Sequence, residues 1–251
     1  MATESHGFAE FHDELRSVAG DVLAKDGVVD WPVLSDAGWT GLEVPEEFGG
    51  AGADHILMVA DGVVAVATPD VTPRPVLDET RRLATVSPRT GDQPEVLRFE
   101  GDPQRAVRSL HDRAAVAVAC DSLGLAEAML SATVSYVKVR EQFGRPVGSF
   151  QAVKHACADM LVEIAVSRQL LGNAVDAVSH GAPGAGVAAA MAKSHVCDAA
   201  VAVVGKAMQL HGGIGYTWES GLHVYLKRAA LNRSLFGSGT AHRKQLAHRY
   251  R

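Results

Sequence analysis

The segment Arg140-Glu-Gln-Phe-Gly-Arg-Pro146 combines residue types that suit an anionic ligand. Two arginines flank an aromatic ring and a glycine, just ahead of a predicted helix. Guanidinium groups make paired hydrogen bonds to phosphate, and the N-terminus of a helix attracts negative charge. The segment therefore suggests a phosphate or pyrophosphate contact. Taken alone, it also fits a solvated turn between two helices, and the residues by themselves favour that interpretation.

A second segment, Gly212-Gly-Ile-Gly215, resembles part of a dinucleotide-binding loop. Such a loop follows a β-strand, whereas this one follows a predicted helix. The chain also has no GxxxxGK[ST] motif, because Gly205-Lys206 is followed by Ala207. We therefore interpret Gly212 and Gly213 as a helix stop, since glycine adopts the left-handed terminating conformation at little cost.

Metal chemistry and serine chemistry have little support in the sequence. The chain has 11 histidines, but His155 and Cys157, like His195 and Cys197, lie two positions apart. On a helix that spacing separates the side chains by about 200°, which is poor for sharing one ion. The motifs HExxH and GxSxG do not occur. We expect no metal site and no serine nucleophile.

Composition excludes several classes of protein. A chain of 251 residues, 47% of them hydrophobic, can bury a core as one large domain or two small ones. A formal net charge of −5 argues against a nucleic-acid-binding protein. The three cysteines form no CxxC pair and predict reduced core thiols in a cytosolic protein. Without an unbroken apolar run of about 18 residues, we expect a cytoplasmic protein with no membrane contact.

The chain divides into three predicted blocks, 1–54, 55–102 and 103–251. The first holds an amphipathic helix over 4–26 and a loop rich in glycine and proline over 43–52. The second holds four short strand candidates that predict one small sheet: Ile56–Ala60, Val63–Ala67, Leu83–Val86 and Val96–Phe99. Asp61-Gly62 favours a hairpin turn between the first two.

The third block is predicted to be helical almost throughout. Three long amphipathic helices are expected over 110–139, 150–175 and about 187–210, followed by shorter ones over 220–235 and 240–250. Ser149 is the expected N-cap of the second helix. Short connections between long helices predict an antiparallel bundle. Because Ala199–Val204 is apolar on more than one face, we expect it to expose apolar area unless the chain pairs with a partner.

Two longer motifs resemble the acyl-CoA dehydrogenase family. Arg140-Glu-Gln-Phe-Gly-Arg-Pro-Val-Gly-Ser-Phe-Gln-Ala-Val-Lys-His155 is similar to a helical hairpin in the family's C-terminal domain. Gln209-Leu-His-Gly-Gly-Ile-Gly-Tyr-Thr-Trp-Glu219 is similar to the second hallmark of that domain. A weaker likeness covers Ala37–Gly52. The resemblance implies a mainly α fold: a C-terminal bundle over 103–251, a reduced N-terminal helical segment and a small remnant β-sheet.

The resemblance implies oxidation of an acyl-CoA thioester to the 2,3-enoyl form. A glutamate takes the α-proton and FAD accepts the hydride. Three departures bear on that chemistry. The family is usually about half as long again, and its flavin-ring segment of the type TEPxAGSD is absent here. The usual base position falls on Phe236, or on Gly237 or Ser238 if the loop is gapped. The alternative position, thirty residues before Gly144, falls on Ala114, with Asp112 the nearest acid. We therefore expect no catalytic residue in this chain.

The family positions that touch a neighbouring subunit's FAD are better matched. The resemblance assigns this role to Arg140, Phe143, Gln209, Gly212 and Gly213, and less clearly to Gln142 and Thr240. It implies an FAD shared with a full-length acyl-CoA dehydrogenase subunit, in a heterotetramer whose partner holds the acyl-CoA. Heteromeric members of the family act on bulky acyl-CoA substrates, so the resemblance extends to a steroid-derived one. Two alternatives stay open: a flavin-free scaffold that kept the bundle to dimerise with itself, and a homomeric enzyme with a different base.

Overall fold

The computed structural model describes residues 56–60, 63–67, 70–87, 95–98 and 101–248. All of them belong to the larger of two compact units, Val44–Arg251. The helix expected over 4–26 and the loop expected over 43–52 lie outside the described residues. The division into three blocks ending at 54 and 102 stays a prediction.

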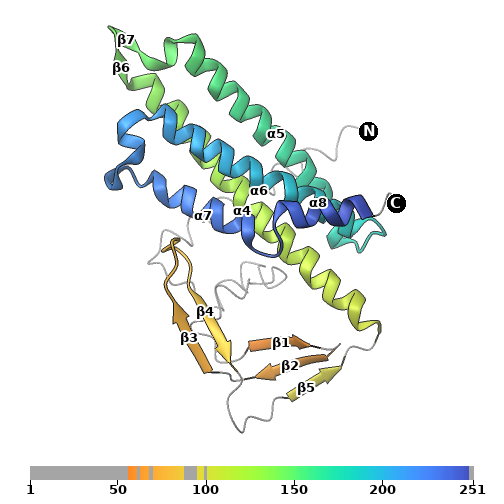
Figure 1. Ribbon diagram of the computed structural model, residues 1–251. Coiled ribbons are helices and arrows are strands. Elements are labelled where there is room, and N and C mark those ends of the chain that lie inside the picture. The colour runs from red at the N-terminus through yellow and green to blue at the C-terminus, as the bar shows by residue number, and fades with distance from the viewer. Residues whose placement is uncertain (1–55, 61–62, 68–69, 88–94, 99–100, 249–251) are drawn as a thin grey trace, which may run out of the picture. The chain divides into compact units, whose positions relative to one another are not determined.

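Helices dominate the described chain. Three long helices run side by side and reverse direction at each connection: α4 (Pro103–Val139), α5 (Gln151–Ser179) and α6 (Ala185–Leu210) (Figure 1). Two shorter helices, α7 (Leu222–Ser234) and α8 (Gly239–His248), pack against α6. The predicted antiparallel bundle and the mainly α fold are confirmed.

Two helix starts differ from the sequence expectation. α4 begins earlier than expected, because the Asp102 side chain accepts a hydrogen bond from the backbone N–H of Gln104 at 2.9 Å and Pro103 occupies the first helical position. The prediction that Ser149 caps α5 is wrong. Ser149 ends a 3₁₀ turn, η2 (Val147–Ser149), and the N-cap is Phe150, which has no side-chain capping bond.

The alanine-rich helix α6 forms the centre of the bundle. It contacts α4, α5, α7 and α8, and its small side chains let these neighbours approach closely. Ala199, Ala200, Val203 and Val204 are all buried. Within the same stretch Val201 is half-buried and Ala202 is exposed. The expectation that this stretch exposes apolar area therefore holds only for these two residues, because helices of the same chain cover the other four.

The strands between Ile56 and Arg98 form two sheets, whereas the sequence predicted one. β1 (Ile56–Ala60), β2 (Val63–Ala67) and β5 (Glu95–Arg98) make an antiparallel sheet in the order β1-β2-β5. β3 (Asp70–Arg74) and β4 (Leu83–Ser87) make a separate hairpin. The sequence analysis missed β3 because it contains Pro73, which lacks an N–H but is tolerated in the edge strand of a two-stranded hairpin.

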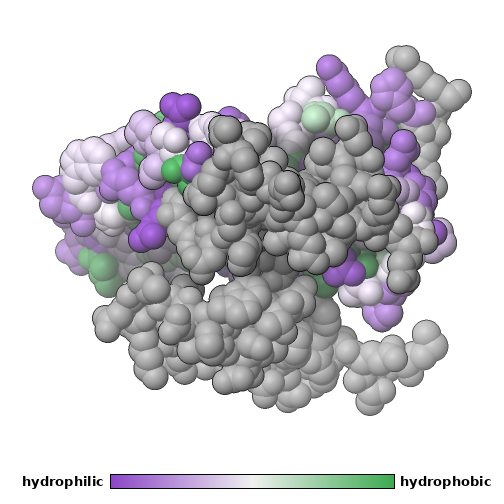
Figure 2. Space-filling view, turned by 90° about the horizontal axis from the view of Figure 1, so that it is seen from below, coloured by the Kyte–Doolittle hydropathy of each residue, from purple (hydrophilic) through white to green (hydrophobic). Residues whose placement is uncertain are grey.

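Two helices reach the length and mean apolarity of a membrane span, a property that a search for unbroken apolar runs misses. The qualifying windows in α4 and α6 are 50% and 67% buried inside the bundle, as expected for core helices of a folded domain. The coloured part of the surface in Figure 2 is mainly hydrophilic, with small separate hydrophobic areas.

The cysteines occupy three different environments. Cys197 is buried in the core, Cys157 is half-buried and Cys120 is exposed, and all three are free thiols. The expectation of core thiols therefore holds for Cys197 alone. Cys120 follows the buried Ala119 in α4 but is rotated by about 100° around the helix, out of the core.

A buried polar network centred on Asn232 joins three helices to the loop between β3 and β4. The fully buried Asn232 side chain accepts a hydrogen bond from Arg81 at 3.0 Å and donates to Asp121 at 2.6 Å and to Ser122 at 3.1 Å. The backbone carbonyl oxygen of Asn232 accepts a hydrogen bond from the Lys193 ammonium at 3.0 Å. A single α7 residue therefore ties α7 to α4, to α6 and to the loop.

Charged groups in the network compensate one another. Burial alone would raise the pKa of the Asp121 carboxyl, but hydrogen bonds from Arg228 and Asn232 and the charge of Arg81 hold it below its usual range. Burial lowers the pKa of Arg81 to about 10, which leaves it protonated at neutral pH. Arg228 also donates to Thr80 at 2.8 Å. The loop is thus held by paired charges.

We predict that Asn232→Ala lowers the free energy of unfolding by about 3 kcal/mol, because it leaves Arg81, Asp121 and Ser122 short of a buried partner. Urea unfolding followed by circular dichroism measures the change. The matched control is Asn173→Ala on the exposed side of α5, for which we expect a change within about 0.5 kcal/mol. Equal effects of the two variants would contradict a structural role for the network.

Candidate functional site

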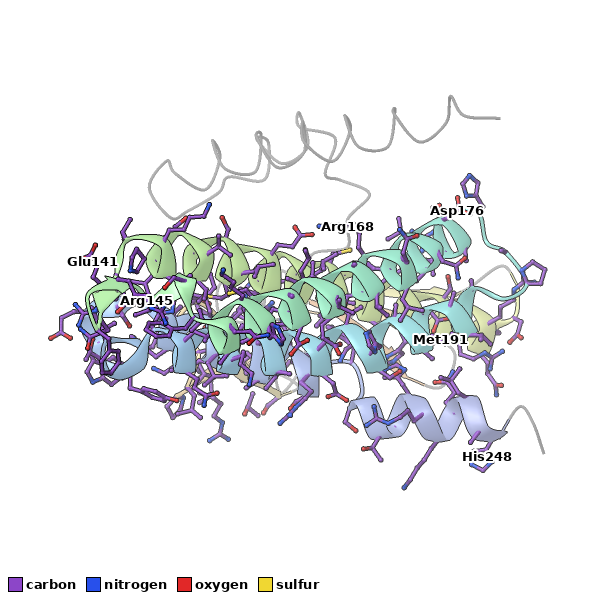
Figure 3. All side chains as sticks on the ribbon, turned by 90° about the horizontal axis from the view of Figure 1, so that it is seen from above. Glu141, Arg145, Arg168, Asp176, Met191 and His248 are labelled. Carbon is purple, nitrogen blue, oxygen red and sulfur yellow. The ribbon has the colours of Figure 1, made fainter. Side chains whose placement is uncertain are left out.

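The arginine-rich segment folds as a tight hairpin at one end of the bundle (Figure 3). Arg140 ends α4, with its N–H bonded to Tyr136 O at 2.9 Å and its own carbonyl accepting from Val147 N at 2.7 Å. β6 (Glu141–Gln142) and β7 (Arg145–Pro146) pair antiparallel. The backbone therefore projects the turn between these strands away from the helices.

The turn places an aromatic residue, Phe143, in an unfavourable backbone conformation. Phe143 has φ 56° and Gly144 has φ 72°, as a two-residue hairpin with both central residues left-handed requires. Such a φ costs a bulky side chain about 1–2 kcal/mol. Phe143 is nevertheless 92% exposed, so burial in this chain does not offset the strain. Strain of this kind concentrates at binding sites.

Phe150 holds the base of the hairpin. The Arg145 guanidinium lies 4.1 Å above the Phe150 ring centroid, and the Phe143 ring meets Phe150 edge to face at 6.1 Å. The Gln142 amide donates to the Glu141 carbonyl at 2.8 Å. These local contacts orient the hairpin and leave the Arg140 side chain exposed.

The glycine segment lies beside this hairpin. The Tyr136 ring in the last turns of α4 stacks on His211 at 4.4 Å, and its hydroxyl donates to the His211 carbonyl at 3.3 Å. Gly212 has φ 66°, which confirms the predicted helix stop, and the chain continues as a 3₁₀ turn, η3 (Gly212–Tyr216). A Cβ on Gly215 would collide with the Met208 carbonyl, so only glycine fits there.

Six of the expected cofactor contacts are therefore brought to one exposed end of the bundle: Arg140, Gln142, Phe143, Gln209, Gly212 and Gly213. Thr240 is not among them. It lies in the first turn of α8, next to Gly239, whose Cβ position is 3.0 Å from Asp198 on α6. Asp198 and Gln209 are eleven residues apart on α6, or about 16 Å along the helix. Within one chain, Thr240 and the hairpin cannot touch the same small group.

The hairpin end is basic although the chain as a whole is acidic. Between residues 138 and 154 the charged residues are Lys138, Arg140, Arg145 and Lys154 against a single acid, Glu141. The net charge of the chain is −5. A local excess of positive charge with an exposed aromatic ring suits a ligand that carries phosphate and a flat ring system.

Phe236, at one expected base position, and Asp112, the acid nearest to the other expected position at Ala114, both pack against other parts of the chain. Phe236 is partly buried against the core, with φ 50°, and its carbonyl lies 3.0 Å from the His242 ring nitrogen Nε2. Asp112 lies against the first turn of α6, where a Cβ on Gly186 would be 3.0 Å from its carboxyl oxygen. Burial raises the pKa of the Asp112 carboxyl, and the nearby His242 partly opposes this shift.

The sequence analysis missed the network of Arg81, Asp121, Arg228 and Asn232. Its only local signal is Asp121, a charged residue within an otherwise apolar stretch of α4. The partners come from a loop 40 residues earlier and a helix more than 100 residues later, so no spacing rule reveals them. Among the described residues, no group of three or more His, Cys, Asp and Glu side chains could hold a metal ion.

We predict that Phe143→Gly raises the free energy of unfolding by about 0.5–1 kcal/mol, because glycine adopts a positive φ without strain and little burial is lost. Phe236→Gly is the matched control, since it relieves the same kind of backbone strain but removes a packed ring. We expect it to lower stability by about 2 kcal/mol. Urea unfolding measures both. Destabilisation by Phe143→Gly would show that the exposed ring stabilises the chain.

Comparison with known proteins agrees with this geometry. The family model "Acyl-CoA dehydrogenase, C-terminal domain" matches residues 105–250. Acyl-CoA dehydrogenase IpdE2 of Mycolicibacterium smegmatis is 39% identical over 184 residues, covering 72% of this chain and 54% of the relative. Acyl-CoA dehydrogenase FadE34 of Mycobacterium tuberculosis is 38% identical over 232 residues, covering 87% of this chain and 30% of the relative.

A solved structure extends the similarity to three dimensions. The Tcur3481-Tcur3483 steroid ACAD variant is 31% identical with a TM-score of 0.68, covering 78% of this chain and 55% of that one. The chain thus spans about half the length of IpdE2 and of this neighbour, and less of FadE34. The matched region contains the hairpin, the glycine segment and the whole bundle, and this chain belongs to the acyl-CoA dehydrogenase family.

Proposed function

We propose that this chain is a subunit of a heteromeric, FAD-dependent acyl-CoA dehydrogenase and that it completes the flavin site of a full-length partner. The observation that carries the proposal is the strained, fully exposed Phe143 beside Arg140 and Gly212 at the basic end of the bundle. This end is built to meet a group outside the chain. The structurally similar steroid ACAD supports a bulky, steroid-derived acyl-CoA as the substrate. In this proposal the partner subunit holds that substrate, in the cytoplasm.

The residues present fit the adenosine and pyrophosphate half of FAD. The exposed Arg140 guanidinium can donate two hydrogen bonds to phosphate oxygens, and Phe143 presents a flat apolar face that excludes water. Glycine at 212 and 213 lets the backbone approach closely. When bound, FAD supplies the hydride acceptor for desaturation. In this proposal the proton of the substrate is taken by a partner glutamate, because Phe236 and Ala114 carry no base.

Assembly is part of the proposal. Leu161, Val162 and Val166 on α5 are 55%, 61% and 43% exposed, although they are large apolar residues on a helix of the bundle. Their spacing places Val162 and Val166 on one face, one turn apart. A monomer rarely leaves such a face in water. We propose that this face of α5, which the sequence analysis did not single out, is covered in a homodimer or heterotetramer.

We predict that the purified chain does not sediment as a stable 26.4 kDa monomer at micromolar concentration. Val162→Glu, which adds a charge to the exposed apolar face, shifts the species toward monomer without unfolding it. The control Gln104→Glu adds the same charge at the exposed start of α4 and leaves sedimentation unchanged. A wild-type chain that is already monomeric would count against assembly through α5.

We predict that Arg140→Ala weakens FAD binding in the co-expressed complex about ten- to a hundredfold, the loss of a charge-assisted contact of about 1.5–3 kcal/mol. Fluorescence titration of the deflavinated complex with FAD measures the change. Arg113→Ala, an exposed arginine on α4 away from the hairpin, is the control and leaves affinity unchanged. Equal FAD affinity in both variants would show that Arg140 only solvates a turn.

We predict that the isolated chain, supplied with FAD, acyl-CoA and an artificial electron acceptor, shows no turnover. In the complex, replacing the partner's glutamate abolishes activity, while Asp112→Ala leaves kcat within about twofold, since a base contributes only when it reaches the reacting carbon. A loss of a hundredfold or more in kcat for folded Asp112→Ala would make this chain catalytic. Failure of the chain to bind any dehydrogenase subunit would favour the scaffold alternative.

A further inference from the structure

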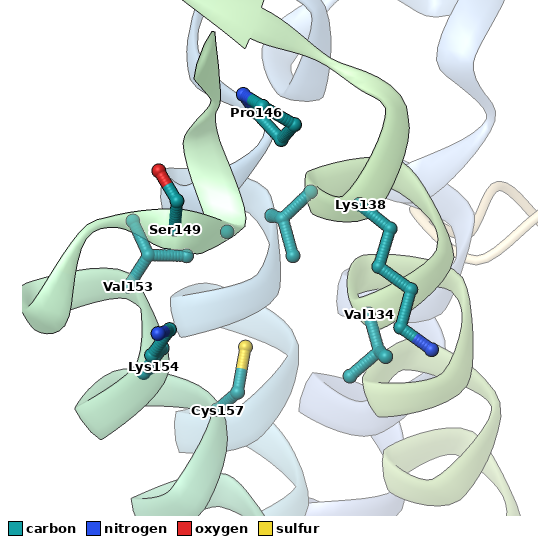
Figure 4. A pocket seen from close by; sticks show the side chains of 9 residues that line it. Val134, Lys138, Pro146, Ser149, Val153, Lys154 and Cys157 are labelled. Carbon is teal, nitrogen blue, oxygen red and sulfur yellow. The ribbon is translucent and has the colours of Figure 1, made fainter.

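A pocket opens between the end of α4 and the start of α5, behind the hairpin (Figure 4). Its volume is about 420 Å³, within the range of small-molecule sites. The lining residues are Val134, Val137, Lys138, Pro146, Gly148, Ser149, Val153, Lys154 and Cys157. None of the seven expected flavin contacts lines it, but Pro146 belongs to the hairpin and Lys138 and Lys154 contribute to its positive charge, so the pocket adjoins the proposed cofactor surface.

The 3₁₀ turn η2, which leads from the hairpin into α5, forms one wall of the pocket. The 3₁₀ turn approaches α4 so closely that a Cβ on Gly148 would lie 2.9 Å from the Val137 carbonyl oxygen. Below this contact, Val153 and Cys157 from α5 face Val134 from α4 across the opening (Figure 4). These side chains are too short to fill the space, which leaves an apolar floor.

The rim carries positive charge on both sides. Lys138 belongs to α4 and Lys154 to α5, and both side chains are exposed enough to bend over an occupant. No acidic residue is among the lining residues. An occupant with an apolar body and an anionic end would bury the body against the valines and pair its charge with two ammonium groups.

We propose that this pocket binds a small amphipathic carboxylate, an alkyl or ring skeleton of roughly ten carbons that ends in a carboxylate group. The apolar floor selects the skeleton, and Lys138 and Lys154 select the negative charge. A neutral or cationic molecule of the same size cannot form the charge pairs with Lys138 and Lys154. The occupant is a carboxylate distinct from FAD and is held within this chain, so the inference goes beyond the proposed function.

Cys157 supplies a direct reporter, because its thiol faces the pocket (Figure 4). Burial raises the pKa of this thiol, so labelling is measured at pH 8.5 with methyl methanethiosulfonate. The full chain carries Cys120→Ser to remove the exposed thiol, while Cys197 is buried. Decanoate, decanol and decylammonium are compared as protecting ligands by mass spectrometry, with affinities from isothermal titration calorimetry.

We expect decanoate to bind one site per chain and to slow Cys157 labelling at least fivefold, with decanol and decylammonium far weaker. Lys138→Met combined with Lys154→Met raises the decanoate Kd at least tenfold. Lys206→Met, an exposed lysine on α6, leaves it unchanged. Val153→Phe, which fills the floor, abolishes protection while circular dichroism shows an intact bundle.

Three results would overturn the proposal. Equal protection by decanoate and decanol would show that charge plays no part. Unchanged decanoate affinity in the double lysine variant or in folded Val153→Phe would place binding elsewhere. Protection of Cys157 by chain assembly alone, with no effect of decanoate, would show that a protein segment of a second subunit occupies the pocket.

Discussion

The described fold depends on the pairing of the polar groups around Asn232. The amide of this fully buried residue bonds to Arg81, Asp121 and Ser122, while its backbone carbonyl holds the Lys193 ammonium. Lys193 is itself fully buried and also donates to the carbonyls of Arg233 and Gly237. An unpaired charge at this depth costs several kcal/mol, so no member can move without exposing another. The network therefore fixes where α7 lies against α4 and α6.

This constraint explains how a small chain keeps the exposed hairpin end, the proposed binding surface, in one conformation. The bundle is held together by paired charges and by the alanine face of α6, so the exposed turn at Phe143 and Gly144 is not needed for the core. The hairpin end accommodates two successive residues in the left-handed backbone conformation, the strained Phe143 and Gly144. Conformational strain persists only where the surrounding structure over-determines it. Here the Phe150 stack and the Val147 to Arg140 hydrogen bond supply that support.

The positions of the interacting surfaces separate three roles along one chain. The hairpin end is basic and aromatic, the exposed face of α5 is apolar, and the pocket between α4 and α5 combines both characters. Each proposed role follows from different physical chemistry: charge and shape for a dinucleotide, apolar area for a subunit, and an apolar floor with a charged rim for an amphipathic anion. In the proposed function Phe236 and Ala114 stand where the family carries its base, so these surfaces are the chain's proposed contribution.

The sequence alone determined the helices, the family and the residues at the exposed end, because these depend on local patterns. Apolar residues at helical spacing predicted α4 to α8, and two contiguous motifs predicted Arg140, Phe143 and Gly212. Only the tertiary structure decided that Ser149 does not cap α5, that most of Ala199–Val204 is covered from within, that the strands between Ile56 and Arg98 form two small sheets and that Thr240 lies apart from the hairpin. The partners in the Asn232 network lie 39 to 151 residues away, and no local pattern records contacts at such separations.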